Sequence, residues 1–356
     1  MRDRVTEREK LRITANYFMA RGEMEKAAET CELWEASYPR DYYPHSWLGY
    51  FYAEMGQLDK ALVETQETLR LAPDSVRSYE NLGASYYVLN RLDEAQVVLD
   101  QALAHKFDSY ELHAKIYHLA FLRADAPQTK QQVDWWAAGK AGAQEVLPSF
   151  QSNTEAYYGR MVKSRDFSRR AVDAALRAGN KEGASSLQID AALREAESGD
   201  VGRARQGVSA ALALSQGRDV QELAALALAR TGDAPRARAL LKELQKNYST
   251  DTLLKIFWLP AINAALAVGK GDSTQALLDL EPAGPYELSE GGYLYPAYVR
   301  GQAYLLAHNG TAAAAEFQKL LDHRGFMGNF VTGSLAHLQI GRAHAMAGDT
   351  AEAKAA

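Results

Sequence analysis

The sequence predicts an all-α protein, a right-handed solenoid of about ten helix-turn-helix repeats. One observation is a small residue that recurs every 34 residues, at Ala27, Ala61 and Ala95. Another is a turn-forming residue five positions before each of these alanines, at Gly22, Gly56 and Asn90. A period of about 34 residues is typical of arrays in which each repeat is one pair of antiparallel helices.

Each element of a repeat has a physical reason. The first helix is expected to end at the Gly or Asn, because these residues adopt the left-handed conformation at low cost. The second helix carries the alanine, because two antiparallel helices pack closely only where one offers a small side chain. The bulky partners of the alanines recur in register: Leu48, Tyr52, Leu82 and Tyr86. Pro39 and Pro73 follow the second helices, which proline cannot continue.

The turn residue and its alanine recur further along the chain: Gly199/Ala204, Gly232/Ala237, Gly271/Ala276, Gly310/Ala315 and Gly348/Ala353. Asp166 and Ala171 predict one more hairpin. We therefore expect three regular hairpins over residues 1–109, a degenerate hairpin or hinge over residues 110–151, and about six further hairpins over residues 152–356. The last of these is truncated at Ala356, so the chain is expected to be a fragment.

Two segments depart from the repeat. Residues 256–269 are apolar and contain Pro260, which predicts a buried first helix with a kink. Residues 281–297 are dense in Pro, Gly and Tyr, which predicts a long loop.

Composition excludes several classes of protein. A membrane span needs about 20 consecutive apolar residues, and the longest apolar run, residues 256–269, is shorter and contains Pro260. Cys31 is the single cysteine, so no internal disulfide is expected, and its register predicts a core position. The default localisation is cytoplasmic, with display outside the cytoplasm by a membrane-anchored parent as the alternative.

No motif for chemistry stands out. Residues 160–246 are modestly basic but lack the interleaved aromatic residues of a nucleic-acid surface, so Arg165, Arg169 and Arg170 are expected to face water. His337 and His344 share a helix face but would need further ligands to hold a metal. We therefore expect no catalysis, no cofactor, no metal and no nucleic-acid partner.

The surface of the solenoid remains as the functional feature. Stacked hairpins present their first helices along a concave groove that serves for binding. The register places eight side chains in this groove: Arg12, Asn16, Tyr43, Ser46, Tyr50, Arg77, Asn81 and Tyr87. Tyrosines supply contact area and a hydrogen bond at low entropy cost, which favours a protein or peptide partner. The alternative is that Tyr43, Tyr50 and Tyr87 fill gaps between neighbouring first helices.

The period and its Gly, Ala and Pro columns resemble those of tetratricopeptide-repeat (TPR) proteins. This resemblance implies the helical solenoid and a role in binding protein segments. Some family members clamp a C-terminal carboxylate, and Arg12 and Asn16 match the first pair of clamp residues. The remaining clamp positions hold Trp47, Glu80 and Ala84, so such a clamp is not expected.

A narrower resemblance concerns short sequence motifs within the repeats. Five stretches are similar to the repeat region that follows the kinase domain in certain bacterial serine/threonine protein kinases: RVTEREK (4–10), LWE (33–35), YPRD (38–41), TEAYYGR (154–160) and YPAYVRGQAY (295–304). Related regions also follow bacterial winged-helix regulator domains. The resemblance implies a sensory or regulatory region whose parent carries any catalysis elsewhere. The chain itself has no glycine-rich loop, catalytic-loop Asp and Asn, or DFG triplet, so it cannot transfer phosphate.

Two other functions stay open at this point. One is a sensor for a small molecule or a cell-wall fragment, with a pocket near Trp135, Trp136 and the loop over residues 286–298. The other is a structural spacer, which predicts self-association through the C-terminal face.

Overall fold

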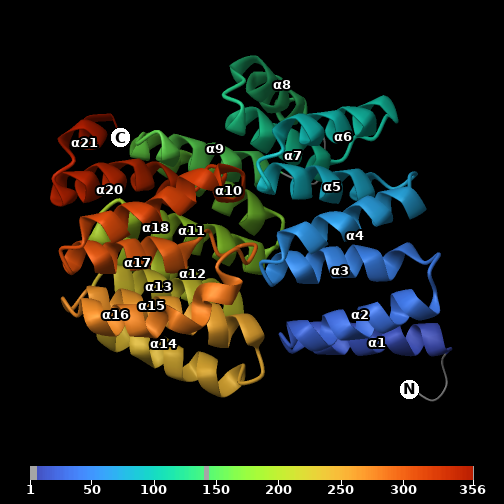
Figure 1. The fold of residues 1–356 in the computed structure, drawn as a ribbon. Coiled ribbons are helices and arrows are strands. Elements are labelled where there is room, and N and C mark those ends of the chain that lie inside the picture. Colours follow the sequence, from blue (N-terminus) through green and yellow to red (C-terminus); the bar gives the residue numbers. More distant parts are fainter. Residues whose placement is uncertain (1–5, 140–143, 356) are drawn as a thin grey trace.

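The computed structural model describes residues 6–139 and 144–355, and every regular element in these ranges is a helix (Figure 1). Arg4, Val5 and Ala356, which entered the sequence analysis, lie outside the described residues. The helices pair as ten antiparallel hairpins. The predicted all-α, TPR-like array of about ten repeats is therefore confirmed.

The bounds of the helices follow the hairpin order. The first helices of the ten hairpins are α1 (Glu7–Ala20), α3 (Tyr42–Glu54), α5 (Val76–Val88), α7 (Tyr110–Leu122), α9 (Val146–Tyr157), α11 (Lys181–Glu197), α13 (Arg218–Arg230), α15 (Leu259–Val268), α17 (Tyr295–Leu306) and α20 (Val331–Ala347). The second helices are α2 (Met24–Ser37), α4 (Leu58–Leu71), α6 (Leu92–Ala104), α8 (Ala126–Ala137), α10 (Met161–Arg177), α12 (Val201–Leu214), α14 (Ala234–Asn247), α16 (Ser273–Leu280), α18 (Gly310–Asp322) and α21 (Thr350–Ala355). Three short elements lie between them: the π-helix η2 (Leu254–Trp258), the 3₁₀-helix η3 (Glu281–Tyr286) and α19 (Arg324–Met327).

Each hairpin turns at one residue with a positive φ angle. These residues are Gly22, Gly56, Asn90, Ala124, Gly159, Gly199, Gly232, Gly271, His308 and Gly348. Within the stretch predicted to be degenerate, α7 and α8 pair like the other hairpins. The division of the chain into three parts stays a prediction.

Two of the predicted turns are misplaced. The fifth hairpin turns at Gly159 (φ 72°) rather than at Asp166, and Ser164, which is 2% exposed, takes the place of the small packing residue. Serine fits there because its hydroxyl lies 3.2 Å from that of Ser152 across the interface, so the buried oxygen is hydrogen-bonded.

The ninth hairpin turns at His308 (φ 55°), two residues before the predicted Gly310. Ala313 is fully buried, whereas the predicted packing residue Ala315 is exposed. Asn309 caps α18 by accepting a hydrogen bond from the backbone N–H of Ala312 at 3.1 Å, which begins the helix earlier than the glycine suggested.

The core follows the predicted small-residue column. Ala27, Ala61 and Ala95 are at most 2% exposed, and Cys31 is fully buried, as the register predicts. Burial raises the pKa of the Cys31 thiol to about 12, which keeps it in the unreactive thiol form. The predicted irregularity near Pro260 takes the form of the π-helical turn η2 directly before α15. No described helix has the length and apolar character required to cross a membrane.

The array returns on itself. Three residues at or next to hairpin turns accept hydrogen bonds from backbone N–H groups of later connecting segments. Thr252 donates to the Gly22 carbonyl (2.9 Å), Glu290 to the Ala53 carbonyl (3.1 Å) and Gly325 to the Asn90 side chain (2.7 Å). The first hairpin thus meets the loop after the seventh, the second meets the loop after the eighth, and the third meets the loop after the ninth. In Figure 1 the turn ends of the blue hairpins face the orange and red C-terminal segments.

The predicted loop over residues 281–297 takes part in this closure. It consists of η3, a series of turns and the start of α17. The Tyr286 hydroxyl donates to Glu25 at 2.5 Å, and the backbone of Leu288 and Ser289 lies against Gly56. The loop therefore covers the turns of the first two hairpins.

Candidate functional site

A cavity of about 430 Å³ lies on the face formed by the first helices, between α3 and α5. Ser46 and Tyr50 line it from α3, and Arg77 and Asn81 line it from α5. One edge is formed by Glu290 and Gly291 of the loop before α17, together with Lys115 of α7. We call this cavity the α3–α5 pocket.

The structure brings together four of the eight residues predicted for the groove: Ser46, Tyr50, Arg77 and Asn81 all line the α3–α5 pocket. Tyr50 is 42% exposed, so its ring is accessible to a partner. The other four predicted residues lie elsewhere.

Tyr87 belongs to the core. It is 7% exposed and stacks on His118 with ring centroids 4.9 Å apart. For this tyrosine the structure supports the alternative role of filling a gap between neighbouring first helices. A Tyr87→Ala substitution would remove packed core volume and is therefore unsuitable as a test of binding.

The remaining predicted residues, Arg12, Asn16 and Tyr43, lie at the N-terminal end of the array. The Arg12 guanidinium lies 5.6 Å from the centroid of the Tyr43 ring, and Tyr43 stacks on Tyr42 at 4.4 Å. Arg12 and Tyr43 are exposed, and Asn16 is half-buried. These three residues do not line the α3–α5 pocket.

Glu54 is the charged group that distinguishes the pocket. Its half-buried carboxylate makes no hydrogen bond or ion pair within the described part of the chain. Burial, reinforced by the Glu290 carboxylate, raises the pKa of Glu54 to about 8, and Arg218 opposes this shift. Lys115, unlike Glu54, is held in its charged form. The Tyr87 hydroxyl and the Glu290 carboxylate raise the pKa of its ammonium group.

Glu54 is expected to give the folded protein a distinctive pH dependence. The native carboxyl holds its proton to a higher pH than the unfolded one, so stability falls as pH rises from about 4.5 to about 8. Glu54→Gln removes this loss and is expected to raise the free energy of unfolding at pH 8.5 by about 1–3 kcal/mol, with little change near pH 4. Urea unfolding at both pH values measures the effect.

The control for this prediction is Glu29→Gln, which removes an exposed carboxylate of α2. It should leave the pH profile of the wild-type chain unchanged. A Glu54→Gln profile parallel to that of the wild type would contradict the assigned environment of Glu54.

Sequence reasoning missed Glu54, although a signal was present. Glu54 ends its first helix, at the position held by Ala20, Val88 and Leu122 in the neighbouring repeats. An acidic residue at a position where the neighbouring repeats have small or apolar residues indicates a role other than packing. Glu290 has no such signal because it lies in a loop outside the repeat register.

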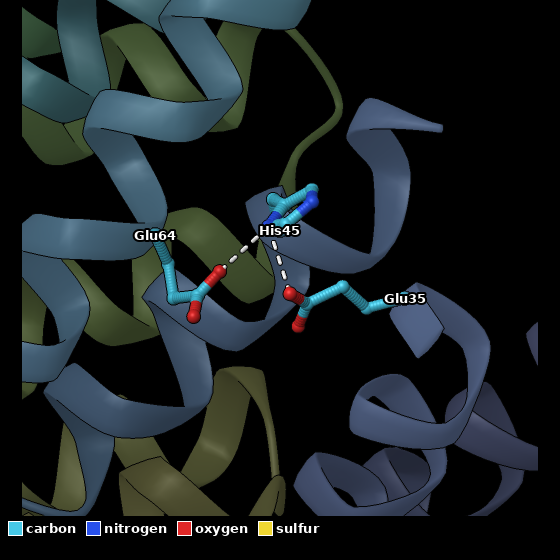
Figure 2. Close-up of side chains that lie close together, drawn as sticks. All are labelled: Glu35, His45 and Glu64. Atoms are coloured by element: carbon cyan, nitrogen blue, oxygen red, sulfur yellow. Dashed lines mark hydrogen bonds and ion pairs between the residues drawn. The ribbon is translucent and has the colours of Figure 1, made fainter. Parts of the chain in front are cut away.

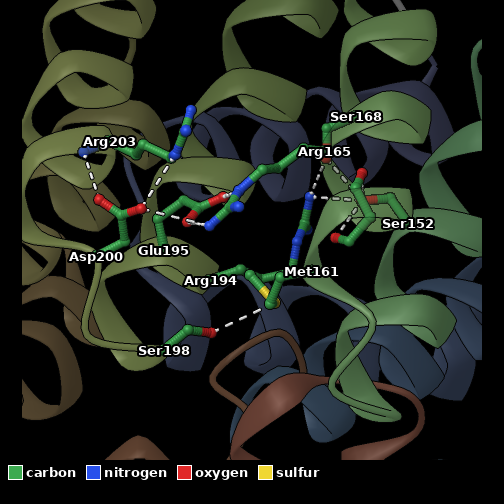
Figure 3. A network of polar contacts seen from close by, with 10 residues as sticks. Ser152, Met161, Arg165, Ser168, Arg194, Glu195, Ser198, Asp200 and Arg203 are labelled. Carbon is green, nitrogen blue, oxygen red and sulfur yellow. Dashed lines mark hydrogen bonds and ion pairs between the residues drawn. The ribbon is translucent and has the colours of Figure 1, made fainter.

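A second polar network joins the fifth and sixth hairpins (Figure 3). Arg194, which is 4% exposed, donates to the hydroxyls of Ser152 (2.9 Å) and Ser168 (2.7 Å). Arg165 pairs with both carboxylate oxygens of Glu195, at 2.7 and 2.8 Å. These groups satisfy one another across the packed helices, so we assign the network a structural role.

Arg169 and Arg170 of the basic stretch over residues 160–246 are exposed, as expected, whereas Arg165 is half-buried. Arg165 is ion-paired with Glu195, and Arg169 lies 2.5 Å from the Asp166 carboxylate. Arg170 lies over the Phe167 ring at 5.0 Å.

The two halves of the predicted sensor pocket lie in separate clusters. Trp136 packs with Ala114 and Tyr117, while Trp135 stacks on His113 with centroids 3.6 Å apart. Tyr286 packs instead with the core of the first two hairpins.

Comparisons with known proteins agree with the repeat architecture. Residues 219–251, which span α13 and α14, match the family model for the tetratricopeptide repeat. No curated protein matches the chain in sequence. The fold and the pocket thus define the class as a TPR-like helical-repeat chain with a charged cavity on its first-helix face.

Solved structures with similar helical arrays include yeast Tom70, at 12% identity and a TM-score of 0.39 over 97% of this chain and 90% of that chain. A complex of Naa15/Naa10 bound to HypK-THB aligns at 15% identity and a TM-score of 0.33, over 98% of this chain and 62% of that chain. The P58(IPK) TPR domain aligns at 13% identity and a TM-score of 0.30, over 97% and 99% of the two chains.

Proposed function

We propose that the chain is a non-catalytic interaction module that binds a protein or peptide segment in the α3–α5 pocket. The observation that carries the proposal is the convergence of Ser46, Tyr50, Arg77 and Asn81, all expected in the groove from the repeat register, on one cavity. An accessible tyrosine beside polar side chains is typical of a surface that binds protein segments.

The charge of the pocket specifies the partner further. Burial and the nearby Glu290 carboxylate make ionisation of Glu54 unfavourable. A lysine or arginine side chain of the partner would stabilise the ionised form of Glu54 and pair with it. Arg77 and Lys115, which also line the pocket, suit a carboxylate or backbone carbonyl of the same segment.

The wider context of the proposal is that of a sensory or regulatory repeat region belonging to a bacterial serine/threonine kinase or regulator. Its support is the resemblance of the repeat motifs, among them TEAYYGR at residues 154–160. In that context, segment binding in the pocket would regulate a catalytic or DNA-binding domain elsewhere in the parent protein.

The test is selection from a random peptide library displayed on phage, with the full chain as bait. Selected peptides are expected to share a basic residue. Tyr50→Ala and Glu54→Gln are each expected to weaken their binding about tenfold, equivalent to about 1.4 kcal/mol. Fluorescence polarisation with labelled synthetic copies of the selected peptides gives the dissociation constants.

The matched control is Tyr158→Ala. Tyr158 is 51% exposed, comparable to Tyr50, but does not line the α3–α5 pocket. Peptides without a shared basic residue would refute the role of Glu54. Equal binding to the wild type and the Tyr50→Ala variant would refute the pocket as the binding site.

The second candidate function is a sensor for a small molecule. The volume of the pocket, about 430 Å³, lies in the range of small-ligand sites and favours this alternative. A ligand that binds the folded chain raises the melting temperature. A thermal-shift screen that included cell-wall fragments would support the sensor if a hit lost its effect in the Tyr50→Ala variant.

A further inference from the structure

Three side chains from three helices converge on the outer side of the first two hairpins. Figure 2 shows Glu35 of α2, His45 of α3 and Glu64 of α4 pointing toward one another. The Nδ1 atom of His45 lies 2.8 Å from Oε2 of Glu64 and 4.0 Å from Oε1 of Glu35. One nitrogen and two carboxylate oxygens thus lie within 4.8 Å of one another.

The charges of this cluster are not balanced by nearby cations. Within the described ranges, neither Glu35 nor Glu64 forms an ion pair with a lysine or an arginine. Arg70, the arginine that lines the adjoining cavity, is held by both carboxylate oxygens of Glu67. His45 is 5% exposed, so the nitrogen between the two acids is shielded from bulk water.

The fourth hairpin offers an internal comparison. His45 and His113 are each the fourth residue of their first helix, and Glu64 and Gln132 are each the seventh residue of their second helix. The Nδ1 atom of His113 lies 2.6 Å from the amide oxygen of Gln132. The other ring nitrogen, Nε2, lies 3.0 Å from the Asp108 carboxylate. At the Nδ1 position, a neutral amide therefore serves where the second hairpin has a carboxylate.

The second hairpin differs in placing two carboxylates at one imidazole nitrogen, whereas His113 has one carboxylate and one amide on different nitrogens. It replaces the amide by the Glu64 carboxylate and adds Glu35 beside the same imidazole nitrogen. Holding two carboxylates together in a partly buried place is unfavourable unless a cation lies between them. The arrangement is the one expected of ligands gathered around a metal ion.

We propose that Glu35, His45 and Glu64 bind a divalent transition-metal ion, with zinc as the best match. Zinc accepts histidine nitrogen and carboxylate oxygen at about 2.0–2.2 Å, and three protein ligands leave one tetrahedral position for water. The imidazole ligand disfavours magnesium and calcium, which prefer oxygen. A cavity of about 550 Å³ lined by all three residues gives water access to the open position.

Such an ion would connect the second helix of the first hairpin to both helices of the second. The α3 helix also supplies Ser46, Tyr50 and Glu54 to the α3–α5 pocket, which shares no lining residue with the cavity beside the metal ligands. Zinc would therefore fix the position of the helix that carries half of the proposed binding site.

The test is titration of the full chain, freed of metal with a chelator, with zinc chloride in a calorimeter. One ion per chain is expected. Glu35→Gln is the main variant, because the Glu35 side chain is 38% exposed and its replacement leaves the fold intact. It is expected to weaken zinc binding by more than the roughly 10- to 100-fold typical of outer-shell substitutions. His45→Asn should abolish stoichiometric binding.

Two controls distinguish the loss of a metal ligand from a change in net charge and from a loss of folding. Glu67→Gln removes a neighbouring carboxylate with the same change in charge and should keep the wild-type affinity. Cobalt(II) in place of zinc should give the intense visible absorption of a four-coordinate site, lost in Glu35→Gln. Several weak sites per chain, or equal losses of affinity in Glu35→Gln and Glu67→Gln, would overturn the proposal.

Discussion

Replacing Gly325 by alanine is expected to separate the C-terminal hairpins from the first ones. A Cβ atom at this position would overlap the carbonyl oxygen of Tyr87 and would lie 2.9 Å from the Asn90 side-chain oxygen. The Tyr87 oxygen is backbone and cannot rotate away, so the contact between α19 and α5 must open. The expected loss in the free energy of unfolding is about 3 kcal/mol, at the upper end of overpacking effects.

Two measurements check this expectation. Denaturant unfolding followed by circular dichroism gives the stability, and small-angle X-ray scattering should show a larger radius of gyration for the variant. Gly284→Ala is the control, because a Cβ atom there meets no atom within 4 Å and should change stability by less than about 0.5 kcal/mol. A Gly325→Ala variant with wild-type stability and dimensions would mean that α19 and α5 are not packed as described.

Breaking the buried ion pair between Glu197 and Arg230 is expected to cost about 3–5 kcal/mol. Both carboxylate oxygens of Glu197 accept hydrogen bonds from the guanidinium, at 2.6 and 2.9 Å, and the two side chains are 0% and 13% exposed. Arg230 also donates to Gln302 at 2.7 Å, so this one residue of α13 connects α11 with α17. The Glu197→Ala substitution leaves the positive charge of Arg230 buried without a carboxylate to pair with it.

A double-mutant cycle measures the pair itself. The combination Glu197→Leu with Arg230→Met replaces both charges by apolar side chains and is expected to recover most of the stability lost in Glu197→Ala. Urea unfolding of the wild type, Glu197→Leu, Arg230→Met and the double variant supplies the values. A double variant as unstable as Glu197→Ala would contradict the assignment of the loss to an uncompensated buried charge.

The sequence predicted the repeat well because its signals are local. A small residue on one helix and a left-handed turn residue five positions earlier are needed in every hairpin, whatever surrounds it. The prediction was wrong where another residue met the same need. Ser164 replaced alanine by hydrogen-bonding its hydroxyl, and His308 took the left-handed turn two residues before the expected Gly310.

The candidate site was less predictable because it depends on how far the array curves. The register predicted Ser46, Tyr50, Arg77 and Asn81 for the groove, and all four line the α3–α5 pocket. The register does not indicate that Glu290, 236 residues after Glu54, closes the same cavity, since the number of hairpins per superhelical turn is set by small rotations between neighbours. The cluster of Glu35, His45 and Glu64 is recognisable only when equivalent positions of different hairpins are compared.

The return of the array on itself changes how the chain must fold. In an open solenoid each repeat contacts only its neighbours, so folding starts anywhere and spreads along the chain. Here the Gly22 carbonyl and the Asn90 side chain can form their hydrogen bonds only after the distant residues Thr252 and Gly325 have packed against them. Such contacts between residues far apart in sequence slow the final step and make unfolding more cooperative. During synthesis, the early hairpins therefore leave the ribosome before the partners of their turns exist.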